Sequence, residues 1–277
     1  MHLNKANKPS LLNFSPLARF GIAITSIISF IAFAWPLYLP ENLLGVQLTQ
    51  RHYWVFFLIV PVSLFFLAIE INRGEIELSA LALLAVLAAL AAALRQIGAG
   101  AVGIEPMWFL LILAARVFGA TFGFALGAIA MALSAILTGG IGPWLPFQIM
   151  AASWIGLFAG SLPKSIRGRL EIAMLMLVAV ISGMTFGFLM DLQLWPWLIG
   201  GDTAISFLPG AGISENLERF IAFHFLTAMA WDIPRSIITA TLIGITASPI
   251  LNALRRTKRR VLFVEPSIGH AMGRKAV

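Results

Sequence analysis

The chain has 277 residues, of which 60% are hydrophobic and only 11% are charged, and its mean hydropathy is +0.92. A soluble chain carries charge on about 25% of its residues, so most of this surface is expected to face lipid. The absence of cysteine excludes disulfides and thiolate metal sites. The net charge of +7 does not indicate a nucleic-acid ligand, because seven of the 19 Lys and Arg residues lie in the last 23 positions.

The apolar runs predict an all-α, polytopic membrane protein. Glycine and alanine occur throughout these runs, which favours helices over the alternating ten-residue strands of an outer-membrane barrel. The first run is too long for the core of a cleavable signal, which spans roughly 7–15 residues. Spans of about 20 residues, or fewer where protein shields them, are expected at 17–39, 53–71, 78–96, 106–118, 120–138, 145–162, 171–190 and 232–251.

Two long apolar runs need an internal break. One continuous helix from Met107 to Leu137 would measure about 46 Å at 1.5 Å per residue, against a bilayer core of about 30 Å. We therefore expect a break near Phe118-Gly119. The second run, 219–251, contains Trp231-Asp232-Ile233-Pro234, in which Asp232 is suited to cap a new helix. This predicts an external or re-entrant segment over 219–231 and a final span from Asp232.

The distribution of basic residues predicts the orientation in the membrane. Eight spans with a cytoplasmic N-terminus place 14 Lys and Arg residues inside and three outside, as the positive-inside rule requires. Both termini are then cytoplasmic in a multi-pass protein of the cell membrane, and 255–277 forms a basic tail. The outer connections are 40–52, 97–105, 139–144 and 191–231, and the length of the last is typical of a functional lid.

The third expected span has a face of small residues. Ala85, Ala89 and Ala93 recur at every fourth position, which lets another helix approach closely. Spacing alone leaves two alternatives open. The face packs against another helix of this chain, or it docks onto a separate membrane subunit.

The stretch GGIGPWLPFQ, residues 139–148, joins two expected spans on the outer side. Trp144 and Phe147 offer flat apolar faces, and Gln148 offers both a donor and an acceptor. This combination suits a planar or ring-shaped ligand. The alternative is an interfacial aromatic belt with a tight turn.

Further candidate ligand contacts lie in the outer loops and in the last span. Asp232 and Arg235 are three residues apart and are able to pair on one helix face, either as a structural pair shared with Arg116 or as a polar contact to ligand. Glu105 is a weaker candidate in the loop 97–105. The aromatic residues expected to form a lid or wall are Trp195, Trp197 and Trp231.

Catalytic, cofactor and metal motifs are absent from the sequence. The histidines, at positions 2, 52, 224 and 270, do not have the spacing of metal ligands, and His224 stands alone among aromatic residues. The sequence contains neither a phosphate-binding loop nor a nucleophile motif. We therefore expect no cofactor, no bound metal and no enzymatic activity, and energy for uphill transport would come from a partner ATPase or an ion gradient.

Three segments carry a resemblance to a known family. The alanine-rich helix from Leu78, the stretch 115–148 and AMAWDIPRSIITA from Ala228 resemble the S components of energy-coupling factor (ECF) vitamin importers. The Gly-Pro-Trp-x-Pro-Phe-Gln string is the most specific of these and is similar to that of cobalamin-type S components. The resemblance implies a six-helix substrate-binding core, an alanine face that docks on a shared transmembrane subunit, and two cytoplasmic ATPases that drive transport.

The resemblance covers about 78–260 and divides the chain into three parts. These are an N-terminal extension with two spans (1–77), the six-helix core (78–254) and the basic tail (255–277). The function expected is capture of a vitamin, with cobalamin or a related compound favoured, at the outer face of the membrane. A self-standing secondary transporter is one alternative, with Arg116, Asp232 and Arg235 as its intramembrane ionisable group. The other alternative is a membrane-embedded enzyme. It would need His, Asp or Glu residues clustered at one membrane face, and the outer acidic residues are too scattered for that.

Overall fold

A computed structural model describes residues 11–12, 15–38, 78–98, 103–198 and 203–263. Helices are the only regular elements of this part of the chain, as expected. Five helical segments are long and apolar enough to cross a membrane, which is compatible with a multi-pass membrane protein. The expected second span, 53–71, lies outside the described residues.

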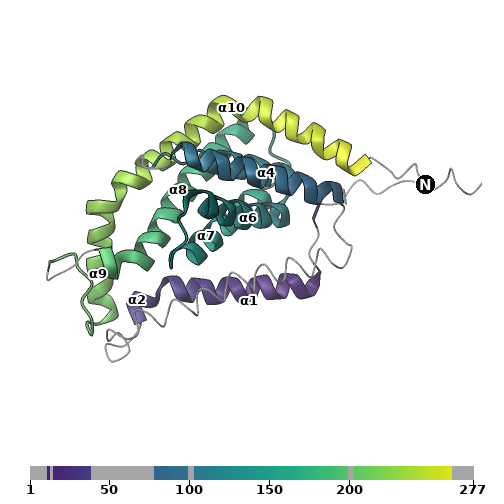
Figure 1. Cartoon of the computed structure of the whole chain (residues 1–277). Coiled ribbons are helices and arrows are strands. Elements are labelled where there is room, and N and C mark those ends of the chain that lie inside the picture. Colours follow the sequence, from purple (N-terminus) through teal and green to yellow (C-terminus); the bar gives the residue numbers. More distant parts are fainter. Residues whose placement is uncertain (1–10, 13–14, 39–77, 99–102, 199–202, 264–277) are drawn as a thin grey trace, which may run out of the picture.

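The helices follow the expected order along the chain. Their bounds are α1 (Pro16–Phe33), α2 (Trp35–Tyr38), α4 (Leu78–Ile97), α5 (Met107–Phe118), α6 (Ala120–Thr138), α7 (Leu145–Ser161), α8 (Arg169–Leu198), α9 (Ile213–Phe223), the π-helical segment η2 (His224–Ala228) and α10 (Met229–Phe263). In Figure 1, α1 runs along one side of the bundle and α10 arches over the other, with α4, α6, α7 and α8 between them. Helix α1 contacts α7 and α8.

Helix α1 begins at a capped N-terminus and ends earlier than the sequence predicts. The Ser15 side chain accepts a hydrogen bond from the Ala18 backbone N–H, and Pro16 occupies the first turn, where its missing N–H costs nothing. The expected span 17–39 is divided at Ala34, after which α2 forms a separate short helix.

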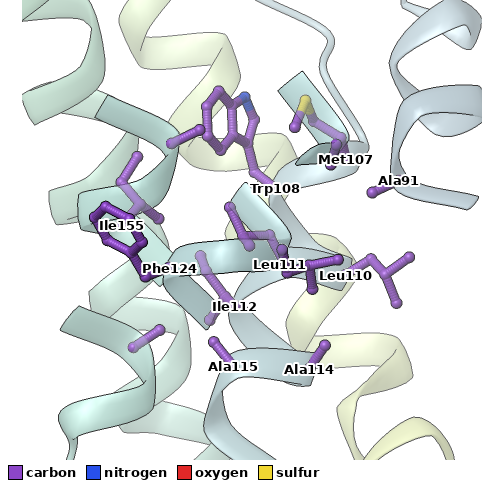
Figure 2. Close-up of a cluster of buried hydrophobic side chains, with 14 of the residues drawn as sticks. Ala91, Met107, Trp108, Leu110, Leu111, Ile112, Ala114, Ala115, Phe124 and Ile155 are labelled. Atoms are coloured by element: carbon purple, nitrogen blue, oxygen red, sulfur yellow. The ribbon is translucent and has the colours of Figure 1, made fainter. Parts of the chain in front are cut away.

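Helix α5 is the centre of the hydrophobic core. Every residue of α5 except Phe109 is buried, although the helix has only 12 residues. Figure 2 shows its side chains reaching α4 at Ala91, α6 at Phe124 and α7 at Ile155. A helix that is apolar on all sides is expected to be enclosed by other helices, and this one is. Because its neighbours shield it, α5 does not need the length of a lipid-exposed span.

The expected break between α5 and α6 is confirmed at Gly119. Gly119 has φ +107°, a conformation that residues with a side chain rarely adopt, and it separates Phe118 from Ala120. A single glycine therefore ends one helix and lets the next start in a new direction.

Helices α6 and α7 approach each other through glycine and alanine. A Cβ atom added at Gly123 would lie 2.2 Å from the Gly156 carbonyl oxygen, and one added at Gly127 would lie 2.3 Å from the Ala152 carbonyl oxygen. The reverse contact, from Gly156 to the Gly123 oxygen, would be 2.0 Å. The two backbones touch, because glycine leaves no side chain between them at these positions.

The end of the chain departs from the prediction. We expected a new helix to begin at Asp232, but Asp232 and Pro234 both lie within α10, which follows directly on η2 and α9. The Asp232 side chain pairs with Arg235 instead of capping a helix, so the sequence signal for a helix start was wrong. Helix α8 also extends past the expected limit of 190, to Leu198.

A buried ionic cluster joins four segments at the end of α5 that carries Arg116. Arg116 donates to Glu171 at 2.8 Å and to the carbonyl oxygens of Leu162, Pro163 and Ile166, and Arg255 donates to both oxygens of Glu171 at 2.6 and 2.7 Å. Arg116 therefore pairs with Glu171 and not with Asp232 and Arg235. Helix α10 continues through Arg255 to Phe263, so the start of the expected basic tail is helical and bound to the bundle.

Candidate functional site

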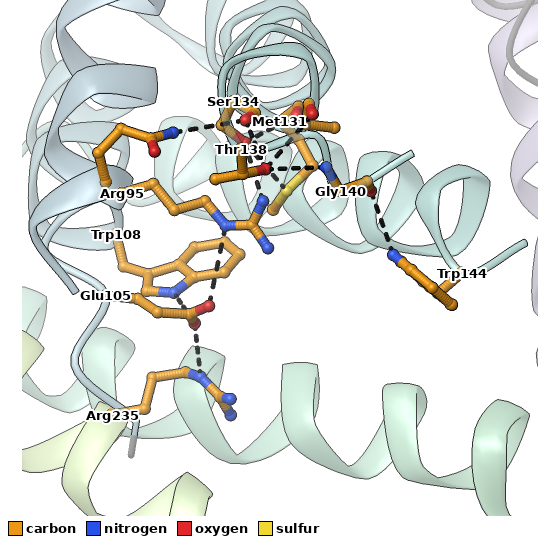
Figure 3. A network of polar contacts seen from close by, with 11 residues as sticks. Arg95, Glu105, Trp108, Met131, Ser134, Thr138, Gly140, Trp144 and Arg235 are labelled. Carbon is orange, nitrogen blue, oxygen red and sulfur yellow. Dashed lines mark hydrogen bonds and ion pairs between the residues drawn. The ribbon is translucent and has the colours of Figure 1, made fainter. Parts of the chain in front are cut away.

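The opposite end of α5 carries a second ionic cluster, and it contains three of the predicted site residues. Arg235 on α10 donates through Nη1 to Asp232, one turn earlier, and through Nε to Glu105 at 2.9 Å. The expected pairing of Asp232 with Arg235 is thus present, and Glu105 joins them from the loop between α4 and α5. Figure 3 shows Glu105 between Arg235 and Arg95. Arg235 also lies over the Phe186 ring, with 5.1 Å from Cζ to the ring centroid.

Glu105 links this cluster to α4 and α6. It accepts a hydrogen bond from the Trp108 indole N–H at 2.8 Å, and Arg95 lies 3.8 Å from its other oxygen. Arg95 in turn donates to the Ser134 hydroxyl at 3.0 Å. Burial by itself would raise the pKa of Glu105, but Arg235, Trp108 and Arg95 together hold that pKa below its ordinary value. Glu105 is therefore an anion at neutral pH, and α4, α5, α6 and α10 meet around it.

The backbone at 103–106 is shaped to bring Glu105 to α10. Gly103 has φ +67°, and a Cβ atom there would lie 2.3 Å from the Trp231 carbonyl oxygen. Gly103 thus rests directly on the α10 backbone, which only glycine permits at this position.

The stretch 139–148 comprises a turn and the first residues of α7 (Leu145–Ser161). Trp144 is exposed, and its indole N–H donates to the Gly140 carbonyl oxygen at 3.3 Å within the same turn. Phe147 is buried against Phe33 of α1, with 4.8 Å between ring centroids. Gln148 is half-buried. Phe147 thus contacts α1, while Trp144 is the aromatic face of this turn that is free to meet a ligand or a headgroup.

The three tryptophans expected to form a lid have different surroundings. Trp195 is fully buried, where it donates to the Ile205 carbonyl oxygen at 2.8 Å and packs on Phe207. Trp197 is exposed on one side and stacks on Trp35, with 4.9 Å between centroids. Trp231 is half exposed on the surface of α10. Trp195 therefore holds the 203–212 segment in place rather than offering a face to a ligand.

A cavity of about 240 Å³ lies between α7 and α8. Its lining is almost entirely apolar and includes Trp154, Phe158 and Phe186, with the Ser182 and Thr185 side chains as polar members. The Ser182 hydroxyl is buried and has no hydrogen-bond partner among the described residues. Phe186 connects the two features, because one residue lines the cavity and also lies under Arg235. None of the predicted contact residues lines this cavity.

The structure brings Asp191 and His224 together, which the sequence did not predict. Asp191 on α8 accepts or shares a hydrogen bond with His224 at 2.8 Å, and one ligand atom from each of Asp191, His224 and Asp232 lies within 4.8 Å of the other two. Asp191, Gly187 and Gly183 recur at every fourth position of α8, which was the available sequence signal. A Cβ atom at Gly187 would lie only 1.8 Å from Asp232 Oδ1, so the glycine leaves room for this carboxylate.

Comparison with protein-family models, with curated protein sequences and with solved structures gives no match.

Proposed function

We propose that the chain is the substrate-binding subunit of an ECF-type ABC importer. In this proposal it captures a vitamin at the outer face and delivers it inward with a shared transmembrane subunit and two cytoplasmic ATPases. The observation that carries the proposal is the orientation of the alanine row on α4.

Ala85, Ala89 and Ala93 are all exposed on α4, whereas the neighbouring positions Ala88 and Ala92 are buried. The exposed row is therefore not used for packing in the described part of the chain. A small residue gains little from facing lipid tails, but it allows a second helix to approach closely. This arrangement supports docking onto a partner helix, the role that the resemblance assigns to the row.

Two observations favour different kinds of vitamin. The Gly-Pro-Trp-x-Pro-Phe-Gln string favours cobalamin or a related compound. The cavity of about 240 Å³ is smaller than sites for drug-sized ligands, which measure roughly 300–1,000 Å³. It would hold a small ring compound, whereas a corrinoid would need the helices to move apart or a larger surface that includes Trp144.

The docking role is tested by Ala89→Trp, co-expressed with the transmembrane subunit and ATPases. The bulky side chain is expected to prevent co-purification of the complex while leaving ligand binding to the isolated chain intact. Leu177→Trp on α8, at an exposed position, serves as the control and should leave assembly unchanged. Normal assembly of Ala89→Trp would exclude this face as the docking surface.

The ligand is identified by mass spectrometry of the small molecules that co-purify with the chain. Trp144→Ala is then expected to weaken binding of that ligand about tenfold, because loss of an aromatic contact and its buried area costs about 1.4 kcal/mol. Phe30→Ala, at an exposed aromatic position on α1, is the control and should bind normally. Equal affinities for the two variants would remove Trp144 from the site.

One observation favours a second candidate, an ion-coupled secondary transporter. Ionisable residues within membrane helices are costly and usually serve transport, and Asp191, His224, Asp232 and Arg235 gather between α8 and α10. Purified chain in liposomes distinguishes the two functions. Uptake driven by an ion gradient alone supports the secondary transporter, and uptake that requires the partner ATPases supports the importer.

A further inference from the structure

We infer that Asp191, His224 and Asp232 form a binding site for one divalent transition-metal ion. The proposal is independent of the importer proposal, because it concerns a metal held by this chain itself. The spacing of the histidines along the sequence had given no reason to expect a metal.

The first observation is the geometry of the three side chains. One carboxylate oxygen from each aspartate and a ring nitrogen of His224 lie within 4.8 Å of one another. Neighbouring ligands of a tetrahedral zinc-sized ion are separated by about 3.4 Å, at roughly 2.1 Å from the metal to each. The longest separation in the site therefore has to contract by at most about 1.4 Å to bind the ion. The Asp191–His224 contact, at 2.8 Å, is already as short as neighbouring ligands require.

The second observation is an independent one, the unpaired oxygen of Asp232. The Asp232 side chain is buried, and Arg235 binds its Oδ1 atom. Its Oδ2 atom has no hydrogen-bond partner among the described residues. A buried acceptor left without a partner costs about 1–3 kcal/mol, and more when it is charged. A metal ion would bind this oxygen and remove that cost, which a simple Asp232–Arg235 pair does not do.

The path of the helix brings the ligands together. His224 and Asp232 are eight residues apart, which is about 12 Å along a straight α-helix. The chain between them contains the π-helical segment η2, which joins α9 to α10 on the curved stretch seen in Figure 1. Single π-helical turns occur frequently at functional sites. One ligand atom from each of His224, Asp232 and Asp191 of α8 lies within 4.8 Å of the others.

The donor set and its surroundings select the kind of ion. Two carboxylates with a neutral imidazole carry two negative charges, which a divalent ion neutralises. An imidazole ligand favours Zn²⁺, Fe²⁺, Co²⁺, Ni²⁺ or Cu²⁺ over Mg²⁺ and Ca²⁺, which prefer oxygen ligands alone. The rings of Phe188, Phe220 and Phe225 lie 5.2, 6.0 and 5.6 Å from the His224 ring and exclude water from one side. Arg235 donates to the Asp232 carboxylate and holds it in place, as hydrogen-bond partners of metal ligands commonly do.

The experiment uses Co²⁺ with the full-length chain in detergent, carrying an affinity tag without histidine. His2, His52 and His270 are replaced by Gln throughout, so that His224 is the only imidazole in the chain. We expect one Co²⁺ per chain, with visible absorption bands typical of a protein-bound ion, and competition by Zn²⁺ but not by Mg²⁺. No Co²⁺ binding, or binding equally displaced by Mg²⁺, would overturn the proposal.

Variants locate the bound ion. Asp191→Asn and His224→Gln are each expected to weaken Co²⁺ binding at least about 100-fold, because loss of a ligand should exceed the roughly 10–100-fold effect of changing a group that only hydrogen-bonds to a ligand. Glu215→Gln, at an exposed acidic position on α9, should bind normally. A loss below tenfold in both ligand variants would show that the ion binds elsewhere.

A measurement on the chain with all three ligands intact covers the case in which the ligand variants fail to fold. The unfolding midpoint should rise steadily with Co²⁺ concentration, since an ion that binds only the folded state stabilises it by mass action. Mg²⁺ should leave the midpoint unchanged. A midpoint that stays constant with Co²⁺, Zn²⁺ and Mn²⁺ alike would identify Asp191 and His224 as a hydrogen-bonded pair without a metal.

Discussion

The contact between α6 and α7 allows a quantitative test of close helix packing. In Gly123→Ala, the new methyl group would lie 2.2 Å from the Gly156 carbonyl oxygen, and in Gly156→Ala it would lie 2.0 Å from the Gly123 oxygen. Real Cβ atoms essentially never approach closer than 3.0 Å, so each substitution must move the helices apart by up to about 1 Å. Overpacking of this kind costs about 1–3 kcal/mol.

The two substitutions are expected to be less than additive. Once one methyl group has separated the helices, the second group enters space that already exists, so the double variant should cost less than the sum of the single variants. Gly244→Ala on α10 is the matched control. Its nearest neighbours are the Met176 Sδ and Cε atoms, each at 3.4 Å, which is an ordinary contact. It should be neutral or more stable by up to about 1 kcal/mol, because alanine restricts the unfolded chain.

The measurement is reversible unfolding of the two single variants, the double variant and Gly244→Ala in mixed detergent micelles. Helicity and tryptophan fluorescence serve as separate signals. Each variant is compared with the unaltered chain at the same micelle composition. Gly123→Ala as stable as Gly244→Ala would refute direct backbone contact between α6 and α7. Strict additivity of Gly123→Ala and Gly156→Ala would refute a shared separation of the helices.

Three further predictions concern polar contacts. The pKa of Glu105 is lowered on folding. The stability that Glu105 contributes is therefore complete above its ordinary pKa and is lost as the pH falls through the lower folded value. Glu105→Gln should accordingly flatten the acid side of the profile of unfolding free energy against pH, measured at pH 3–6. Glu171→Gln, which removes the buried partner of two arginines, should cost about 3–5 kcal/mol in the same assay, whereas Glu215→Gln in a surface pair should cost at most about 1 kcal/mol. Asn216→Ala removes both hydrogen bonds to the Leu208 backbone. Protease cleavage within 203–212 should therefore accelerate, while the unfolding midpoint stays close to that of the unaltered chain. An unchanged cleavage rate would contradict this anchoring role.

Much of the helical architecture could be predicted because its signals are local. The apolar runs and the glycine and proline residues that interrupt them predicted the helices α4 to α7 nearly to the residue. The break at Gly119 was predictable for the same kind of reason, because the run was too long and the glycine allowed a turn. The local signal failed at Asp232, where an aspartate and a proline predicted a helix start inside a continuous helix.

The orientation of side chains needed the tertiary structure. Fourfold spacing identified Ala85, Ala89 and Ala93 as one face of a helix, but only the packed bundle decided that this face is exposed while Ala88 and Ala92 are buried. Spacing records which residues share a face, and it carries no information on which neighbour covers that face. The same limit applied to Trp195, whose outer-loop position predicted a lid and whose side chain is buried in the structure.

The sequence by itself determined the helical, membrane-compatible character of the chain, the bounds of α4 to α7, and the pairing of Asp232 with Arg235 one turn apart. The tertiary structure alone decided that Glu105 reaches Arg235, 130 residues away, and that Asp191 meets His224 and Asp232. The physical reason is that chain length, hydropathy and helical spacing act between near neighbours. Long-range clusters instead depend on how helices cross and bend, which here is set by close approach at Gly183 and Gly187 and by the π-helical turn before α10.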